Sequence, residues 1–271
     1  MKLGCSSWSY HRAFENNKLT LEKWLYMCAD ELMLDGVELL DFHLNEPGID
    51  FKKIKNLIVS KGLSISSISV SNNFGYLSDD TLKEEVKKVK NWIDITSQFG
   101  ASILRVFAGW EDLAPWDAGF GKTRADRNLI WQRMIKCMKE CVEYADQTGI
   151  VLAVENHNHR GLISTAEDSK KIIREINSPW FKLNLDTAGY TEDIYSAIED
   201  TLDLAVQVHI KILESADDEI DKKLDYNKIF DILNTSNYRG FLSIEYEGEE
   251  DEFIAVPRLV KLIKNKMIQI K

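Results

Sequence analysis

Short apolar segments alternate with longer amphipathic segments from one end of the chain to the other. The apolar segments have the length of β-strands, and segments with apolar residues at helical spacing separate them. Two of these separating segments, 80–99 and 124–147, are long enough for helices of several turns. Gly62, Gly100 and Gly149 stand where a helix is predicted to end and a strand to begin, as a C-terminal cap glycine does. The predicted strands are 2–8, 36–40, 63–70, 101–107, 150–156, 180–186, 206–212 and 240–246.

This alternation predicts the α/β class, and the number of repeats predicts the architecture. Strands that each lead into a helix, eight times within about 250 residues, are typical of a single (β/α)8 TIM barrel. No linker rich in Pro, Gly and Ser divides the sequence, so we expect one barrel domain over residues 1–271. An open doubly wound sheet is the alternative, but it favours a glycine-rich turn after an early strand. Here the first strand leads into SSWSYHRAF.

Composition and charge restrict the partners and the location. Lys and Arg number 34 against 44 Asp and Glu, a net charge of −10, which argues against a nucleic acid or an anionic membrane as partner. No signal peptide and no run of about 18 apolar residues is present, so we predict a cytoplasmic protein. The four cysteines are then predicted to be free thiols, with Cys137 and Cys141 in the core rather than in half of a metal site. The sequence is compatible with a homo-oligomer.

The last four predicted strands carry the main chemical signal. Successive strand residues face opposite sides, and in each of these strands one side is apolar while the other carries polar groups. The polar side faces the barrel interior, and the carboxyl ends of the strands are where barrel enzymes place their chemistry. The polar residues at or near those ends are Glu155, Asp186, His209 and Glu245.

Three carboxylates and one imidazole at one place would repel one another without a cation between them. A divalent metal ion fits that position, and the oxygen-rich set favours Mn²⁺ or Mg²⁺, with Co²⁺ or Zn²⁺ also compatible. Four protein ligands leave two octahedral positions for neighbouring substrate oxygens.

Several fragments resemble a known family. LAVENH, LNLDTAG, VHIKI and LSIEYEG are similar to the fifth to eighth strand motifs of the xylose isomerase-like TIM-barrel superfamily, and LRVFAGW and DGVELL to its fourth and second. That superfamily contains sugar isomerases, ketose 3-epimerases, inosose dehydratases and type IV endonucleases. The resemblance implies a divalent metal on Glu155, Asp186, His209 and Glu245. It also implies that Glu155 and Glu245 act as acid and base on opposite faces of the substrate.

Two positions differ from the ketose 3-epimerases of that superfamily. Those enzymes place a substrate-binding histidine three residues after the metal aspartate and an arginine six residues after the metal histidine. Here the two positions are Gly189 and Ser215. The ENH stretch that ends at His157 is more similar to the inosose dehydratase and hydroxypyruvate isomerase members.

Further polar and aromatic residues are predicted around the metal. His157 shares the inward parity of Glu155, which favours substrate contact or acid catalysis over packing in a loop. Lys211 stands in the same relation to His209 and would bind a carboxylate or neutralise an enediolate, unless it forms a structural ion pair. The substrate-binding candidates are His157, Lys211, Arg105, Trp8 and Trp110.

Arg105 and Glu38 have a second interpretation, because both point inward on earlier strands. This placement favours a buried charge network over direct ligation. Trp8 and Trp110 fall at strand ends, where aromatic rings pack against the C–H faces of sugars or against other residues.

A metal that holds a carbonyl and an adjacent hydroxyl acidifies the C–H bond between them, and a nearby carboxylate can remove that proton. We therefore predict a divalent-metal-dependent isomerase or epimerase that acts on an uncharged ketose or polyol through an enediolate. An inosose-type dehydratase is the alternative on the same site. A type IV-like endonuclease and a non-catalytic sugar-binding barrel are further alternatives. A phosphorylated sugar is disfavoured because the loop after the last strand reads YEGEED, and the acidic run at 247–252 is predicted to be a solvated helix entry.

Overall fold

The computed structural model describes residues 1–110, 126–215 and 219–269. Its strands follow the order β1 to β8 and close into one barrel, and the neighbouring strands whose register is resolved run parallel. The predicted (β/α)8 barrel and all its predicted strands are therefore confirmed. The strands are β1 (Lys2–Ser6), β2 (Gly36–Leu40), β3 (Ser64–Ser69), β4 (Ile103–Phe107), β5 (Val151–Glu155), β6 (Phe181–Asp186), β7 (Ala205–Ile212) and β8 (Phe241–Tyr246).

Two compact units make up the chain, and each is described here by itself. The first unit comprises residues 1–67 and 207–271, and the second comprises residues 68–206. The assignment of residues 1–271 to one domain stays a prediction.

In the first unit, β1 pairs with β2 on one side and with β8 on the other, and β7 pairs with β8. Phe241 fills the space beside Gly36, where an added Cβ would lie 2.8 Å from its ring and 2.6 Å from the Ser64 carbonyl oxygen. A side chain at position 36 is thus excluded by the close approach of the strands. The helices of this unit are α1 (His11–Glu15), α2 (Leu21–Tyr26), α3 (Asp41–Leu44), α4 (Phe51–Ser60), α9 (Tyr226–Thr235) and α10 (Glu252–Gln269).

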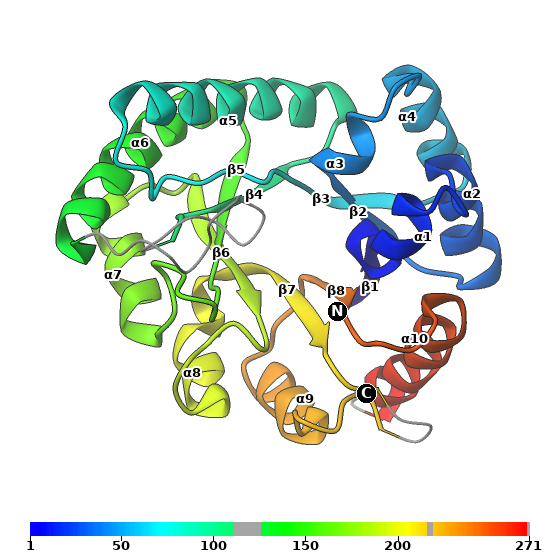
Figure 1. The fold of residues 1–271 in the computed structure, drawn as a ribbon. Coiled ribbons are helices and arrows are strands. Elements are labelled where there is room, and N and C mark those ends of the chain that lie inside the picture. Colours follow the sequence, from blue (N-terminus) through cyan, green and yellow to red (C-terminus); the bar gives the residue numbers. More distant parts are fainter. Residues whose placement is uncertain (111–125, 216–218, 270–271) are drawn as a thin grey trace. The chain divides into compact units, whose positions relative to one another are not determined.

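In the second unit, β5 lies between β4 and β6, and α5 (Asp79–Phe99) and α6 (Arg127–Thr148) pack against each other (Figure 1). The two helices confirm the predictions for 80–99 and 124–147, except that positions 124 and 125 lie outside the described residues. Both end at a glycine in the left-handed region, with φ of 75° at Gly100 and 72° at Gly149. The later helices of this unit are α7 (Ala166–Ile176) and α8 (Ile194–Thr201).

The first strand is shorter than predicted. It ends at Ser6 rather than at residue 8, because the Ser6 hydroxyl accepts a hydrogen bond from the Trp8 backbone N–H at 3.3 Å. This bond caps a 3₁₀ turn over Ser7–Tyr10, and the turn carries the chain out of the barrel wall.

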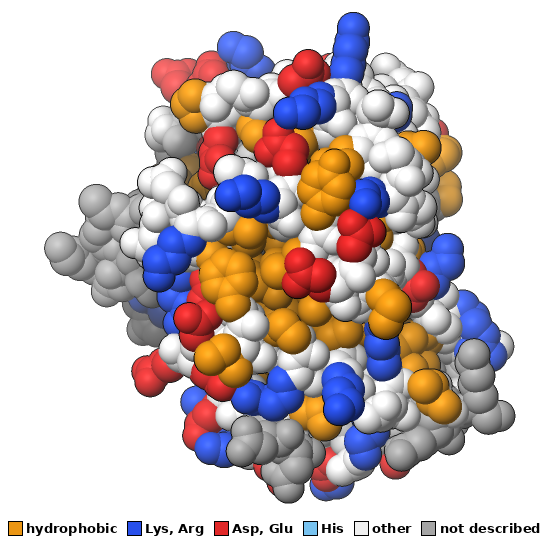
Figure 2. All heavy atoms as spheres, turned by 90° about the vertical axis from the view of Figure 1, so that its right-hand side faces the viewer, with side chains coloured by type: hydrophobic (Ala, Val, Ile, Leu, Met, Phe, Trp, Pro, Cys, Tyr) orange, Lys and Arg blue, Asp and Glu red, His pale blue; other side chains and the backbone are white. Residues whose placement is uncertain are grey.

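The charges on the surface, the helices and the cysteines can be compared with what the composition predicted. Figure 2 shows one face on which Lys and Arg side chains lie among Asp and Glu side chains, around a group of hydrophobic ones. None of the described helices combines the length and the apolar composition needed to cross a membrane. Cys5, Cys28, Cys137 and Cys141 are free and buried, as predicted.

Candidate active site

In the second unit, the strands β5 and β6 each end at a buried carboxylate residue. Glu155 is the last residue of β5 and Asp186 the last of β6. Their neighbour Asn156 joins the two strand ends, because its side chain accepts from the Asp186 N–H at 2.8 Å and donates to the Asp186 carbonyl at 3.0 Å. The Asp186 carboxylate also accepts from the Ala188 N–H at 2.7 Å. These hydrogen bonds fix the end of β6 against the residue that follows β5 and orient the Asp186 carboxylate.

Arg105, on β4, is the cationic partner of Glu155. Its Nε lies 3.1 Å from Glu155 Oε2, and both side chains are almost completely buried. The guanidinium also donates to the Val70 carbonyl at 3.2 Å and stacks 4.0 Å from the centre of the Phe107 ring. A buried arginine placed in this way fixes the orientation of the Glu155 side chain. The prediction that Arg105 belongs to a buried charge network is thus confirmed, and its predicted contact with substrate stays a prediction.

An aromatic group lies next to this pair. The His157 ring is 5.8 Å from Phe107 and 5.4 Å from Trp110, in edge-to-face arrangements. Trp110 is fully buried and pairs with Gly161 through an isolated β-bridge. This packing accounts for the position of both His157 and Trp110, and their roles toward a substrate stay predictions.

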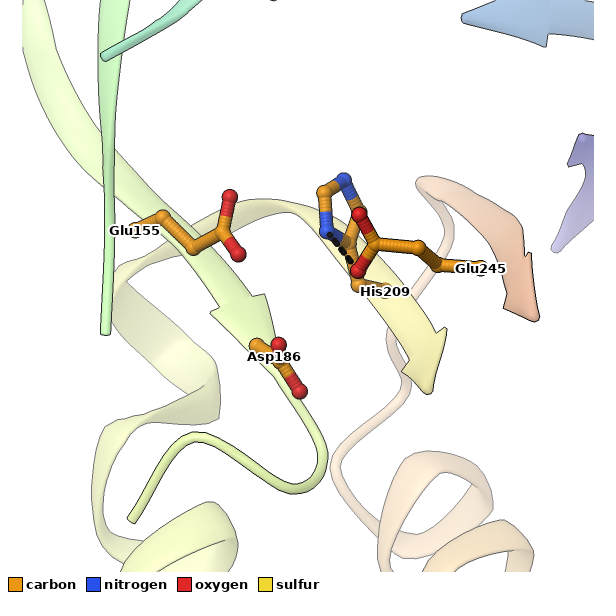
Figure 3. A group of neighbouring side chains, drawn as sticks. All are labelled: Glu155, Asp186, His209 and Glu245. Carbon is orange, nitrogen blue, oxygen red and sulfur yellow. Dashed lines mark ion pairs between the residues drawn. The ribbon is translucent and has the colours of Figure 1, made fainter. Parts of the chain in front are cut away.

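In the first unit, His209 and Glu245 lie on the neighbouring strands β7 and β8. His209 Nδ1 is 3.3 Å from Glu245 Oε2, and Lys211 Nζ is 2.8 Å from the same oxygen. Burial alone would raise the pKa of the Glu245 carboxyl, but the Lys211 ammonium and the His209 imidazole hold this pKa well below its usual value. Glu245 is therefore a carboxylate at neutral pH. Figure 3 draws His209 and Glu245 together with Glu155 and Asp186.

Lys211 has a second acidic partner that the sequence analysis missed. Its Nζ donates to Glu247 Oε1 at 2.9 Å, and the same oxygen accepts from the indole N–H of Trp8 at 2.8 Å. Trp8 in turn stacks on His11, with ring centres 4.5 Å apart. The signal for Glu247 was available, because it continues the inward parity of Ser243 and Glu245 by two residues. Lys211 and Trp8 are thus joined through one carboxylate.

Glu38, on β2, is completely buried, accepts hydrogen bonds from Gln207 and Ser243, and lies 2.9 Å from His209 Nε2. The predicted buried network at Glu38 is therefore confirmed. The ring partner of Glu38 is the His209 imidazole, whereas Arg105 pairs with Glu155.

The acidic run at 247–252 leads into α10, and Glu247, Glu249 and Asp251 are exposed, in agreement with the predicted solvated helix entry. Glu250 accepts two hydrogen bonds from the Arg258 guanidinium, and Glu252 accepts from Arg12 and from the Ala13 N–H. These ion pairs were not predicted, because the partners lie far away in sequence or on the next helix, which local patterning does not reveal.

The two positions that differ from the ketose 3-epimerases have structural reasons. An added Cβ at Gly189 would lie 2.3 Å from the Asn156 carbonyl oxygen, so no histidine fits this backbone. Ser215 donates to Glu250 at 3.2 Å and accepts from Arg258 at 3.0 Å. Ser215 therefore hydrogen-bonds to both members of the ion pair between Glu250 and Arg258.

The protein is an α/β barrel with a closed ring of strands, and its later strands carry buried acidic and imidazole side chains. The chain belongs to the xylose isomerase-like TIM barrel family, whose sequence profile matches residues 29–265.

Solved structures of similar fold include sugar-modifying enzymes. A 3-keto-D-glucoside 4-epimerase from E. coli superposes with a TM-score of 0.76 at 18% identity, over 97% of this chain and 99% of that one. A D-psicose 3-epimerase from Clostridium cellulolyticum H10 gives a TM-score of 0.79 at 15% identity, with 100% of both chains covered. A probable 3-DHS dehydratase from Bacillus anthracis gives 0.75 at 18% identity, over 98% of this chain and 99% of that one. At these identities the likeness shows the fold. No curated protein sequence gives a significant match.

Proposed function

We propose that the protein is a divalent-metal-dependent sugar isomerase or epimerase whose metal ligands are Glu155, Asp186, His209 and Glu245. The observation that carries the proposal is that each unit brings two of these buried side chains to neighbouring strands: Glu155 and Asp186 end β5 and β6, and His209 Nδ1 on β7 lies 3.3 Å from Glu245 Oε2 on β8. The order of the strands supports it as well, because β5 to β8 follow one another around the barrel.

The donor set fits a divalent ion. Asp and Glu oxygens with one imidazole suit Mn²⁺ or Mg²⁺ best, and Co²⁺ or Zn²⁺ are compatible. The low pKa of Glu245 means that this ligand is already deprotonated, as metal binding requires. When bound, the ion would supply polarisation of a substrate carbonyl and its neighbouring hydroxyl.

Glu155 and Glu245 are the proposed proton carriers, from β5 and β8. Each is paired with a cation, Arg105 or Lys211. The lowered pKa of Glu245 means that this residue starts the reaction as a carboxylate and can act as a base. Removal of the proton beside the carbonyl gives an enediolate of the substrate. Return of the proton to the neighbouring carbon gives isomerisation, and return from the opposite face gives epimerisation.

Lys211, His157, Arg105, Trp8 and Trp110 are the proposed substrate-binding residues. Lys211 is the best placed of these to bind a substrate oxygen. Its ammonium donates to Glu245 and Glu247, so it lies directly beside a proposed proton carrier. Trp8 presents a partly exposed indole beside this ammonium, which suits the C–H face of a sugar. We therefore favour an uncharged ketose or polyol.

A dehydratase on the same site is the second candidate. Gly189 favours it, because the backbone there excludes the histidine that ketose 3-epimerases carry at this position. Loss of a β-hydroxyl from the same enediolate would give the dehydrated product. The two candidates share the first proton transfer and differ in the product, which a product analysis by NMR distinguishes.

An endonuclease is disfavoured by the net charge of −10 and by the mixed charges on the face in Figure 2. A non-catalytic sugar-binding barrel would keep the ligands but would not exchange the proton beside the substrate carbonyl.

Metal content and affinity test the proposal. The metal-free protein should bind one Mn²⁺ in calorimetry, and Asp186→Asn and His209→Ala should each lower the affinity at least about tenfold, because each removes one of four ligands. Asp221→Asn is the matched control, since Asp221 is also a buried aspartate but accepts backbone N–H groups of its own loop. Normal metal binding by both ligand variants would refute the ligand assignment.

A further inference from the structure

Glu38 has an unusual set of partners for a buried carboxylate. It is completely buried on β2. Within the first unit Gln207 donates to it through Nε2 at 3.0 Å and Ser243 through Oγ at 2.6 Å, and His209 Nε2 lies 2.9 Å from it. The proposed function gives Glu38 no part. Glu38 contacts the imidazole of a proposed metal ligand, His209, rather than an arginine or lysine, which indicates a role other than charge pairing.

The geometry determines which nitrogen of His209 carries the proton. Nε2 lies 3.1 and 2.9 Å from the two oxygens of Glu38. A lone pair on Nε2 would face both carboxylate oxygens and be repelled by them, whereas an N–H there makes a charge-assisted hydrogen bond. Nδ1 lies at the longer distance of 3.3 Å from one carboxylate oxygen, Glu245 Oε2, so in a neutral His209 the proton is favoured on Nε2 and the lone pair on Nδ1.

Gln207 and Ser243 hold Glu38 in the orientation that this requires. Gln207 Nε2 also donates to Ser67 Oγ at 2.9 Å, so both amide hydrogens are used and the side chain is fixed. Ser243 donates from the strand next to that of His209. Gln207 and Ser243 both donate a hydrogen to Glu38, so only an acceptor at position 38 satisfies them.

We propose that Glu38 is a positioning residue, which orients the His209 ring and keeps the proton on Nε2 so that Nδ1 is presented as the metal-binding nitrogen. This inference rests on the proposed metal site. A carboxylate behind a histidine ligand commonly fixes the tautomer and raises the basicity of the metal-binding nitrogen. Glu38 itself touches neither metal nor substrate.

Nitrogen NMR tests the tautomer directly and needs no activity. The chain has five histidines, so a ¹⁵N-histidine-labelled sample gives a spectrum simple enough to assign with His209→Ala. In the wild-type chain, both metal-free and loaded with Mg²⁺, Nε2 of His209 should be protonated, and in the loaded form Nδ1 should be unprotonated. A loaded wild-type protein with the proton on Nδ1 would overturn the inference.

Glu38→Gln tests the consequence for metal binding. The amide keeps the shape but offers one acceptor oxygen and turns an N–H₂ group toward one of the three donors. We expect a Mn²⁺ affinity lower by about 10- to 100-fold, with a shift of His209 toward the Nδ1-protonated tautomer. Glu252→Gln is the matched control, because Glu252 is a buried carboxylate of the same unit that binds Arg12 and the Ala13 N–H. This control should lose stability and keep its Mn²⁺ affinity.

The outcomes separate this inference from the proposed function. If the wild-type protein binds no divalent metal, the proposed function fails, and the protonation of His209 in the metal-free chain still decides whether Glu38 fixes the tautomer. If the wild type binds Mn²⁺ but Glu38→Gln keeps both the affinity and the proton on Nε2, the inference is wrong and the proposed function stands. If Glu38→Gln does not fold, the wild-type spectrum alone decides.

Discussion

At the scale of single residues, the two proposed proton carriers are paired with cations of different kinds. The Arg105 guanidinium packs on the Phe107 ring and pairs with Glu155, so it holds that side chain in one orientation. Lys211 is shared between Glu245 and Glu247 and has a flexible stem, so its ammonium can turn toward a substrate oxygen. The side of the site near Glu245 is therefore the better suited to bind a substrate oxygen.

His43 offers a separate test at this scale. It is buried, stacks 4.0 Å from Phe14 and shares a hydrogen bond of 2.9 Å with the Ser7 hydroxyl. Burial, together with the nearby His11, lowers the pKa of His43 from 6.5 to about 4. The unfolded chain therefore binds more protons between these pH values, and the free energy of unfolding should fall as the pH falls from about 6.5 to 4.

We expect His43 to account for at most about 3 kcal/mol of this acid-dependent loss, since each unit of pKa corresponds to about 1.4 kcal/mol. Urea unfolding of the wild type and of His43→Gln at several pH values measures it. The variant should lose less stability than the wild type on acidification. Parallel stability curves for the two proteins would contradict the assignment.

Much of the residue-level picture follows from side-chain parity, and some of it does not. Alternation along β5 to β8 predicted that Glu155, Asp186, His209 and Glu245 lie on the inward side of their strands, and all four are buried. It did not show that Lys211 reaches Glu247, or that His209 donates to Glu38, because these bonds join residues that are distant in sequence. Such pairs depend on how neighbouring strands are aligned, which no local pattern encodes.

At the scale of elements, strand positions were predicted well because each buried strand is a short apolar run bounded by polar turns. Helix ends were predicted where a glycine marks them, as at Gly100 and Gly149. The end of β1 was predicted two residues too late, because the Ser6 hydroxyl caps a turn that apolar patterning cannot reveal. The ion pairs that the acidic run before α10 forms with Arg258 and Arg12 were missed for a similar reason.

Gly149→Ala tests the role of the glycine caps. Gly149 has a φ of +72°, and an added Cβ would meet no atom within 4 Å, so the cost is backbone strain alone. We expect the free energy of unfolding to fall by about 1 kcal/mol, and less for Gly149→Asn. Asn177→Gly is the matched control, because Asn177 caps α7 with a φ of 49°, and this change should not destabilise. A fully tolerated Gly149→Ala would show that α6 ends differently in solution.

At the scale of the whole molecule, the strand order closes a barrel, yet the chain divides into two compact units. The first unit is built from both ends of the chain, so it is complete only when residues 1–67 and 207–271 come together. We therefore expect the protein to fold as the one domain that the sequence predicts.

Calorimetry checks this expectation. Unfolding should occur in a single transition whose calorimetric and van't Hoff enthalpies agree. Mn²⁺ should raise the midpoint temperature, because a ligand that binds only the folded state stabilises it. Chelation should leave the far-ultraviolet circular dichroism unchanged, since the core of Val, Ile and Leu does not depend on the metal. Two separate transitions would show that the units unfold independently.

Exchange of the proton beside the substrate carbonyl, followed by NMR in D₂O, tests the central claim most directly. The Mn²⁺-loaded protein, screened with ketoses and cyclic polyols, should incorporate deuterium at that carbon of its substrate. Glu155→Gln and Glu245→Gln keep the side-chain volume but remove a base, so each should lower kcat by about 10² to 10⁴ with a smaller effect on KM. If both variants keep wild-type exchange and turnover on the same substrate, the two-carboxylate mechanism is wrong.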